Sequence, residues 1–415
     1  MTKPARRTGL LLAARATFVS FKYPNYRLWF FGQLVSLVGT WMQTTAQGYL
    51  VFELTRSPAY LGYVGFAAGV PAWLFTLYGG LIADRMSRRT LLIITQTTMM
   101  TLAFGLAGLT FSGWVQPWHI IGFAFLLGIA NAFDAPARQA FVLEMVSRED
   151  LTNAIALNST MFNSATAVGP AAAGLIYAWL GPAWCFTINA ISFVAVIIAL
   201  ALMKLEKPAL AVRKTQPLQD IKAGLAFVAA HKTVRTIILN LGVVSLFGLS
   251  FVTLMPAWAV KILGGNATTN GLMQSARGIG ALIGALMTAA LGRLHMRGRL
   301  LTYGNIVMPV CLLAFAAIRL LPFSLLTLLG IGWGFMVYAN NANSLVQTQV
   351  PDDLRGRVMS IYTLTFFGFM PIGALLAGSI AENIGEPLTV LLGTIVLLAA
   401  AGLVIWRVPE LFRLE

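Results

Sequence analysis

Ionisable side chains inside apolar runs are the residues of this sequence best suited to chemistry. Asp134 and Arg138 are four residues apart in one run, so on a helix they share a face and can pair. Arg277 lies near the middle of another run, with no acid at a similar depth in the second half of the chain. Charges at membrane depth are costly and usually functional. We therefore expect Arg277 either to anchor an anionic or catecholate-like substrate or to be a buried structural charge.

A stripe of polar side chains follows one face of the run at 28–52. Ser36, Thr40, Gln43 and Gln47 recur at spacings of four, three and four, which is the period of an α-helix. Such a face either lines a cavity that binds substrate or forms hydrogen bonds between helices, and the sequence leaves both open. Gln43 and Gln47 are the better cavity candidates, because a long amide reaches furthest.

Further candidates for substrate binding lie in the second half of the chain. Asn340 is one of several amides in the run at 324–348, most of which we expect to bond neighbouring helices. Phe247 and Phe251 could supply an apolar wall, although lipid-facing or interfacial aromatic residues are commoner.

Membrane-spanning helices are needed to position these residues. Of the 415 residues, 58% are hydrophobic and 10% are charged. The apolar runs match helices that cross a bilayer of about 30 Å and exceed the strands of a membrane β-barrel. The sequence therefore predicts an all-α membrane protein. Its twelve predicted spans are approximately 28–52, 60–83, 90–112, 119–142, 151–178, 184–204, 236–260, 269–291, 300–320, 324–348, 357–381 and 388–406.

The longest polar interruption separates two sets of six spans. The predicted parts are a lead-in at 1–27, a six-helix bundle at 28–204, a linker at 205–235, a second six-helix bundle at 236–406 and a tail at 407–415.

The two predicted bundles look like copies of each other. Gly62 and Gly69 recur as Gly271 and Gly278 with an offset of 209, and Gly169 and Gly174 recur as Gly373 and Gly378 with an offset of 204. A nearly constant offset favours two pseudo-symmetric bundles. Two such bundles can rock about a central site and expose it to one side at a time.

Charge predicts the orientation of the chain. Most of the 29 Lys and Arg residues fall in loops that would share one side, so the positive-inside rule places both termini in the cytoplasm. The net charge of +15 follows these loops and does not indicate a nucleic-acid partner. Cys185 and Cys311 lie in apolar runs, so neither a disulfide nor a metal site is expected.

A short charged turn, Gly80 to Arg89, joins the second and third runs. It resembles the signature loop of the major facilitator superfamily, Gly-x-x-x-Asp-Arg-x-x-Arg-Arg. Three longer passages look like one branch of that superfamily, the transmembrane secretion effector group, which includes the enterobactin exporter and macrolide efflux proteins. These passages are Gly39 to Gln43, Asn131 to Gln139 and Pro351 to Ser360.

The resemblance implies roles for several residues. It implies a charge latch at the inner mouth, in which Asp134 meets Arg88 while Asp84 faces the start of the span at 357–381. We favour this role over direct contact with substrate. The latch residues are Gly80, Asp84, Arg85, Arg88, Arg89, Asp134 and Arg138.

Two more roles follow from the resemblance. Gly169, Pro170 and Gly174 are similar to the helix-packing antiporter motif of the fifth span. Many relatives have an acid where this chain has Thr40, so Asp134 is the default candidate for carrying a proton.

The implied function is secondary active export of small amphipathic molecules, of drug or siderophore type, driven by proton entry. The implied location is a bacterial inner membrane, and we expect a monomer whose partners are the substrate, protons and the bilayer. An importer of a solute such as a sugar, or a receptor that does not transport, are the alternatives. The sequence has no zinc-protease motif, nucleophile elbow or P-loop, so we expect neither an enzyme nor a cofactor.

Overall fold

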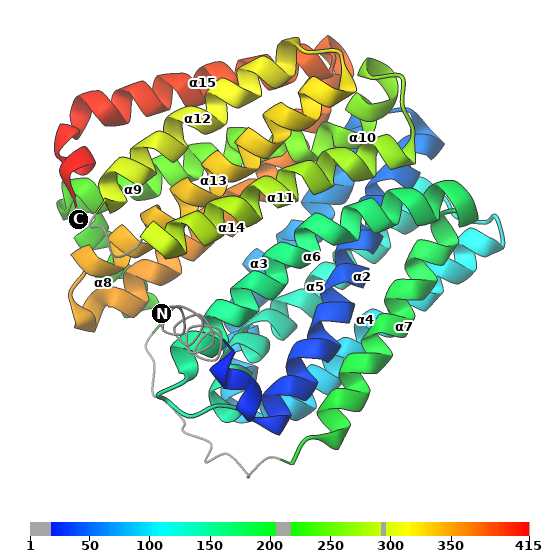
Figure 1. Cartoon of the computed structure of the whole chain (residues 1–415), viewed down its shortest axis with the longest axis horizontal. Helices are drawn as coiled ribbons and strands as arrows, with labels where there is room; N and C mark the ends of the chain where they lie inside the picture. The colour runs from blue at the N-terminus through cyan, green and yellow to red at the C-terminus, as the bar shows by residue number, and fades with distance from the viewer. Residues whose placement is uncertain (1–17, 205–216, 292–295, 415) are drawn as a thin grey trace, which may run out of the picture.

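Two groups of long helices make up the protein in the computed structural model (Figure 1). The structure describes residues 18–204, 217–291 and 296–414, without the side chains at 76, 77, 80, 81, 83–85, 217–221 and 413. Helices account for most of this part of the chain, and no strand occurs in it. The prediction of an all-α protein is confirmed.

The first group contains six long helices and two short 3₁₀ turns. They are η1 (Val19–Lys22), α2 (Pro24–Thr55), α3 (Pro58–Arg85), α4 (Arg88–Phe111), α5 (Pro117–Phe141), η2 (Val142–Glu144), α6 (Leu151–Leu180) and α7 (Pro182–Leu202). Four of the long helices, α2, α3, α5 and α7, have proline in the first turn, where its missing N–H costs nothing.

The second group begins within the last residues of the predicted linker, at Lys232. Its elements are α9 (Lys232–Val243), η3 (Val244–Gly248), η4 (Ser250–Leu254), α10 (Met255–Ala257), η5 (Trp258–Ile262), α11 (Ala267–Leu291), α12 (Arg297–Ala317), α13 (Leu321–Gln349), α14 (Asp352–Ile384), α15 (Glu386–Arg407) and η6 (Pro409–Arg413). Part of the predicted linker is itself a helix, α8 (Pro217–Ala230), which packs against α14 where Gly224 approaches Arg357.

Eight segments of the described chain are long and apolar enough to cross a membrane. They are Arg88–Phe111, Pro117–Glu144, Pro182–Leu202, Lys232–Ile262, Arg297–Ala317, Leu321–Gln349, Asp352–Ile384 and Glu386–Arg407. The remaining long helices are α2, α3, α6 and α11. Helix α2 carries the polar stripe described above, α6 and α11 contain buried polar residues such as Asn163 and Gln274, and α3 contains Pro71 and several glycines.

Helices pair in the same pattern in both groups. In the first, α2 packs on α6 and α7, α3 packs on α5, and α4 packs on α5 and α7. In the second, the segment from α9 to η5 packs on α14 and α15, α11 packs on α13, and α12 packs on α13 and α15. The last two helices of each group are joined by one glycine with positive φ, Gly181 (90°) and Gly385 (84°). These glycines are 204 positions apart, which is the offset found in the sequence.

Two ends of the molecule can be defined from the chain path. The tail end is where α2 begins and α15 ends, and the far end carries the turns at 56–57, 181, 263–266 and 385. In Figure 1 the two groups of helices converge toward the far end, where α6 meets α11, and their ribbons diverge toward the tail end.

The seventh predicted span is irregular, whereas hydropathy predicts one continuous helix. From Val244 to Ile262, past its predicted end, it consists of π and 3₁₀ turns with the short helix α10 between them. Pro256 cannot donate a backbone hydrogen bond, and Gly248 and Ser250 favour helix poorly. A break of this kind is typical of sites where a helix bends or binds.

Candidate translocation site

Two helix crossings hold the groups together in the far half of the molecule. At the first, α3 meets α14. A Cβ atom added at Gly62 would lie 2.8 Å from the carbonyl oxygen of Ala374, and one added at Gly378 would lie 2.8 Å from the Cα of Gly62. Two backbones can approach this closely only where both residues are glycine.

At the second crossing, α6 meets α11 through the corresponding glycines. A Cβ atom at Gly271 would lie 3.0 Å from the Cα of Gly174 and 2.4 Å from the carbonyl oxygen of Pro170. Pro170 has no N–H, so the carbonyl of Thr166 lacks its helical donor, and this carbonyl lies against Gly278 instead. Two members of the predicted packing motif, Pro170 and Gly174, therefore lie on the boundary between the groups.

Gly169, the third member, faces the other way. A Cβ atom there would lie 2.6 Å from the Cβ of Trp41 in α2. Gly373, its counterpart in α14, would similarly meet the carbonyl oxygen of Leu246 in η3 at 2.3 Å. The repeated glycines of the sequence thus make equivalent contacts in the two groups.

Hydrogen bonds reinforce the boundary near the far end. Ser57 Oγ and the backbone N–H of Ala59 donate to Glu382 Oε2 at 2.7 and 3.2 Å. The carboxylate of α14 therefore lies at the positive N-terminus of α3. Thr45 Oγ1 donates to Gln274 Oε1 at 3.5 Å and Thr268 Oγ1 donates to the carbonyl of Gly174 at 3.2 Å. Sequence patterns did not single out Glu382, because its partners are distant along the chain.

Burial along α14 changes from the far end to the tail end. Pro371, Gly373 and Ala377 are buried, whereas Ser360 and Phe367, nearer the tail end, are exposed. The far half of this helix therefore has a buried face against α3, whereas more of its tail half is exposed.

Asp134 lies inside the first group, where only 1% of its surface is exposed. Its Oδ1 accepts hydrogen bonds from Thr95 Oγ1 at 2.8 Å and Gln96 Nε2 at 2.9 Å, both from α4. Arg138 Nε lies 3.6 Å from Oδ2, which is the ion pair expected from the spacing. Donors and a cation together make a buried carboxylate tolerable.

The arginines after α3 have other partners than expected. Arg88 donates to Glu144 Oε1 at 2.8 Å, so the prediction that Arg88 meets Asp134 is wrong for this conformation. Arg89 donates to the carbonyl of Ala201 at 2.8 Å and caps α7. Gly80, Asp84 and Arg85 fall within α3, but their contacts lie outside the described part of the chain.

The polar stripe of α2 points largely into the first group. Gln43 Oε1 accepts from Asn189 Nδ2 of α7 at 2.6 Å, and Gln47 Nε2 donates to the carbonyl of Ile120 in α5 at 3.1 Å. Ser36 is buried, and Thr40 Oγ1 donates to the carbonyl of Ser36 at 2.9 Å. Both glutamines thus bond neighbouring helices, while Gln43 Nε2 remains buried without a partner.

The candidates of the second group differ in their surroundings. Phe251 is buried and packs edge-on against Phe315, with ring centroids 5.9 Å apart. Phe247 is partly buried against the same core. Asn340 is partly buried on α13.

Arg277 lies on α11 in the same stripe as Asn270 and Gln274. Its side chain keeps some exposure, but its Nε atom is enclosed and has no hydrogen-bond partner. The backbone carbonyl of Arg277 abuts Gly332, where a Cβ would come within 1.9 Å, so α11 and α13 are in close contact at this level.

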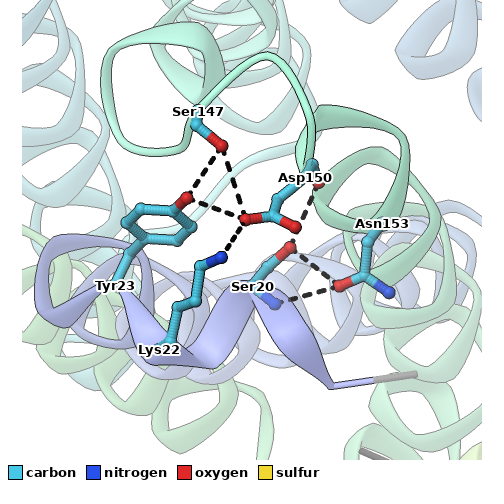
Figure 2. A network of polar contacts seen from close by, with 6 residues as sticks. All are labelled: Ser20, Lys22, Tyr23, Ser147, Asp150 and Asn153. Carbon is cyan, nitrogen blue, oxygen red and sulfur yellow. Dashed lines mark hydrogen bonds and ion pairs between the residues drawn. The ribbon is translucent and has the colours of Figure 1, made fainter. Parts of the chain in front are cut away.

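A polar network near the tail end was missed by the sequence interpretation (Figure 2). Lys22 Nζ lies 2.5 Å from Asp150 Oδ2, and Tyr23 Oη donates to the same oxygen at 2.7 Å. Ser20 Oγ donates to Asn153 Oδ1 at 2.7 Å. The pair with Lys22 lowers the pKa of Asp150 and raises that of Lys22. This network ties η1 to the start of α6.

The sequence was compared with protein families and with known proteins. The profile of the family described as "Transmembrane secretion effector" matches residues 15–412. The Staphyloferrin A transporter of Staphylococcus aureus is 27% identical over 364 residues, which cover 86% of this chain and 90% of that protein. The multidrug efflux pump Tap of Mycolicibacterium fortuitum is 27% identical over 396 residues, covering 93% and 96%. The enterobactin exporter EntS of Escherichia coli is 25% identical over 372 residues, covering 86% and 85%.

Solved structures show the same fold. A bacterial homologue of the human lysosomal transporter Spinster, inward-facing and unoccupied, has a TM-score of 0.71 at 11% identity and covers 94% of this chain and 97% of that chain. A D-xylose–proton symporter has a TM-score of 0.72 at 15% identity, with 91% and 97% covered.

Proposed function

Because the chain belongs to the transmembrane secretion effector family of the major facilitator superfamily, a family of multi-pass membrane transporters, we propose that it is a proton-coupled exporter of small amphipathic molecules. The three relatives are named for staphyloferrin A, for multidrug efflux and for enterobactin. Substrates of drug or siderophore type are proposed for this chain on that basis.

One observation carries the proposal of alternating access. The crossings of α3 with α14 and of α6 with α11 bring the groups into contact at the far end, while residues of the tail half of α14 such as Ser360 and Phe367 are exposed. A carrier open to one side has this arrangement, and its opposite conformation needs the far-end contacts to separate.

Twelve spans in two pseudo-symmetric bundles, 28–204 and 236–406, are part of the proposal. Its supports are the matched helix pairing, the glycine turns at Gly181 and Gly385, and the equivalent contacts of Gly169 and Gly373. Duplicated bundles are the usual framework for rocking about a central site.

We propose that the protein lies in a bacterial inner membrane with its tail end on the cytoplasmic side. Basic residues gather there, whereas the described basic residues of the far end are few. The tail-end group is Lys22, Arg27, Arg88, Arg89, Arg138, Arg148, Lys204, Lys222, Lys232, Arg235, Arg297, Arg299, Arg355, Arg357 and Arg407, and the far-end group is Arg56, Lys261 and Arg319. The positive-inside rule assigns the richer side to the cytoplasm.

Asp134 is the proposed proton carrier. It is a buried acid in a membrane helix, bonded to two side chains of α4 and paired with Arg138. Protonation would remove the charge that Thr95 and Gln96 of α4 bond and Arg138 pairs with, so it would weaken the contact between α5 and α4. The charge latch is proposed in revised form, with Arg88 bonded to Glu144 in this conformation and available to other partners when the tail end closes.

Everted membrane vesicles test the function. The vesicles are loaded with an acidic interior and supplied with a panel of siderophores, macrolides and dyes. We expect at least one compound to accumulate only where the protein is present, and the accumulation to vanish when the pH gradient is collapsed. Accumulation that ignores an imposed gradient would reject proton coupling, and equal accumulation with and without the protein would reject export.

A further inference from the structure

Arg277 has a depth that suits binding at the centre of the membrane. It is ten residues from the start of α11, at Ala267, which corresponds to about 15 Å along a helix. The hydrocarbon core is about 30 Å thick, so this distance ends near its middle. The side chain is therefore at the level where a central binding site is expected.

The position of Arg277 on α11 places it beside the boundary between the two groups. Gln274, three residues earlier on the same helical face, accepts the hydrogen bond from Thr45 of α2. Gly278, the next residue, lies against Thr166 of α6. Arg277 is thus one turn nearer the tail end than the closed contact between Thr45 and Gln274.

No carboxylate neutralises this cation in the described part of the chain. Three described acids of the helices and their ends are engaged elsewhere: Asp134 with Arg138, Glu144 with Arg88, and Glu386 with Lys261. Glu382 accepts from Ser57, and Glu53 accepts from Tyr177. No hydrogen bond or ion pair joins Arg277 to another described residue, and its enclosed Nε is unsatisfied.

Other polar atoms on the same helix also lack partners. Asn270 Nδ2 and Ser275 Oγ are enclosed without hydrogen bonds, and Gln274 Nε2 reaches only Asn270 Oδ1 at 3.3 Å. Buried polar groups are normally bonded, so the unsatisfied nitrogens of Asn270 and Arg277, which share one face of α11 with Gln274 while Ser275 lies on another face, point to a missing partner. A partner that accepts hydrogen bonds and carries negative charge would satisfy the nitrogen donors of this set.

We infer that Arg277 binds the carboxylate of an anionic amphipathic substrate at the boundary between the two groups of helices. The inference rests on the proposed transport function and narrows its substrate class to organic acids. A guanidinium matches a carboxylate with two parallel hydrogen bonds, which a lysine ammonium cannot reproduce. The amide donors of Gln274 and Asn270, about one and two turns nearer the far end, are suited to further oxygen atoms of the same molecule.

Matched pairs of ligands test this inference on the purified full-length protein. The probes are benzoate, naphthoate and anthroate, each compared with its uncharged methyl ester. Thermal stabilisation in detergent identifies binding, and titration calorimetry gives Kd for the acid with the largest shift. We expect at least one acid to bind at least about tenfold more tightly than its ester, a difference of about 1.4 kcal/mol.

Three variants assign the preference to the side chain. Arg277→Gln should bind acid and ester equally, whereas Arg277→Lys should retain a weaker preference for the acid. Arg56→Asn is the matched control, because it removes an exposed arginine whose left-handed backbone (φ 56°) asparagine also tolerates. If Arg277→Gln does not fold, the comparison of the wild type with Arg277→Lys still measures the effect of guanidinium geometry.

The inference is overturned if no acid of the panel stabilises the wild type, if the esters bind as tightly as the acids, or if the preference survives in Arg277→Gln. Binding is measured at equilibrium and without a membrane gradient. Acid binding together with absent export would therefore overturn the proposed function and leave the anion site standing. Export of compounds that carry no acid would overturn the anion site and leave the proposed function standing.

Discussion

The closed far end should open when the crossing of α3 and α14 is overpacked. In Gly378→Ala the new methyl group would lie 2.7 Å from the carbonyl oxygen of Pro58 and 2.8 Å from the Cα of Gly62. These are backbone atoms and cannot rotate away. Overpacking of this kind costs about 1–3 kcal/mol. Only the conformation in which α3 and α14 touch carries that cost.

The magnitude follows from comparing two alanine variants. Gly402 lies in α15, and a Cβ atom there would meet nothing within 4 Å. Both substitutions gain about 1 kcal/mol of helix propensity, which acts equally on every conformation in which the residue is helical. The difference between the variants is then the overpacking cost alone, and it corresponds to a shift of about 5–150-fold in the equilibrium between the closed and open far end.

Spin labels at Leu54 and Ile384, both exposed at the far end, report the distance between α2 and α14 in a protein whose Cys185 and Cys311 have been replaced. Double electron–electron resonance should show a population with a longer distance between the two labels. This population should grow in Gly378→Ala and stay at the wild-type level in Gly402→Ala. Unchanged distances in a well-folded Gly378→Ala protein would refute the claim that this crossing closes the far end.

Two further predictions concern the carboxylates of the first group. Asp134→Asn removes the partner of Arg138 and should abolish the dependence of transport on a pH gradient in vesicles. Asp150→Asn, outside the membrane helices, should retain that dependence. Equal gradient dependence in the two variants would exclude Asp134 as the proton carrier. In hydrogen-exchange experiments corrected for intrinsic rates, the backbone amides of residues 18–23 should lose protection in Asp150→Asn. In the wild type they should lose protection only below about pH 4. Lys22 lowers the pKa of Asp150, so the ion pair is intact above the ordinary carboxyl pKa and is lost as pH falls through the lowered value. The pKa of Lys22 is raised, so alkali breaks the ion pair only above the ordinary lysine pKa of about 10.4. Equal protection of this segment in wild type and Asp150→Asn near neutral pH would show that the pair does not hold η1.

Helices could be predicted from sequence because a bilayer leaves few alternatives. Backbone groups in hydrocarbon must bond within one helix, so a long apolar run converts directly into a span. Breaks within a span are harder to predict. Between Val244 and Ile262 the residues are mostly apolar, yet Gly248 has a low helix propensity and Pro256 lacks a backbone N–H, and π and 3₁₀ turns form there.

Partners across the fold were predicted less well than positions along the chain. The glycine repeat identified Gly62, Gly174, Gly271 and Gly378 but did not show which of them meet, because that depends on how the two groups dock. The sequence predicted the helical spacing of the polar stripe of α2, but it did not predict which neighbouring helices the stripe faces. A helix surrounded by others has more than one buried side, and Gln47 faces α5.

Charge pairing failed for a related reason. Glu144 follows α5 in a short 3₁₀ turn, and spacing along the chain cannot show that this turn brings it to Arg88 at the start of α4. The pair of Asp134 and Arg138 was predictable because both residues lie on one helix, four positions apart. Local geometry follows from sequence, whereas contacts between helices need the docked structure.

The two central charges differ in a way that bears on coupling. Asp134 has a cation and two hydrogen-bond donors in its own group, whereas Arg277 has no described partner and lies at the boundary that must close. Enclosing an unpaired cation is expensive, so closing the tail end over an empty site would carry a cost of several kcal/mol. A bound carboxylate removes most of that cost. On the proposals made above, occupancy of Arg277 would favour closure of the loaded carrier, and the empty carrier would depend on a second event, such as protonation of Asp134, to change its conformation.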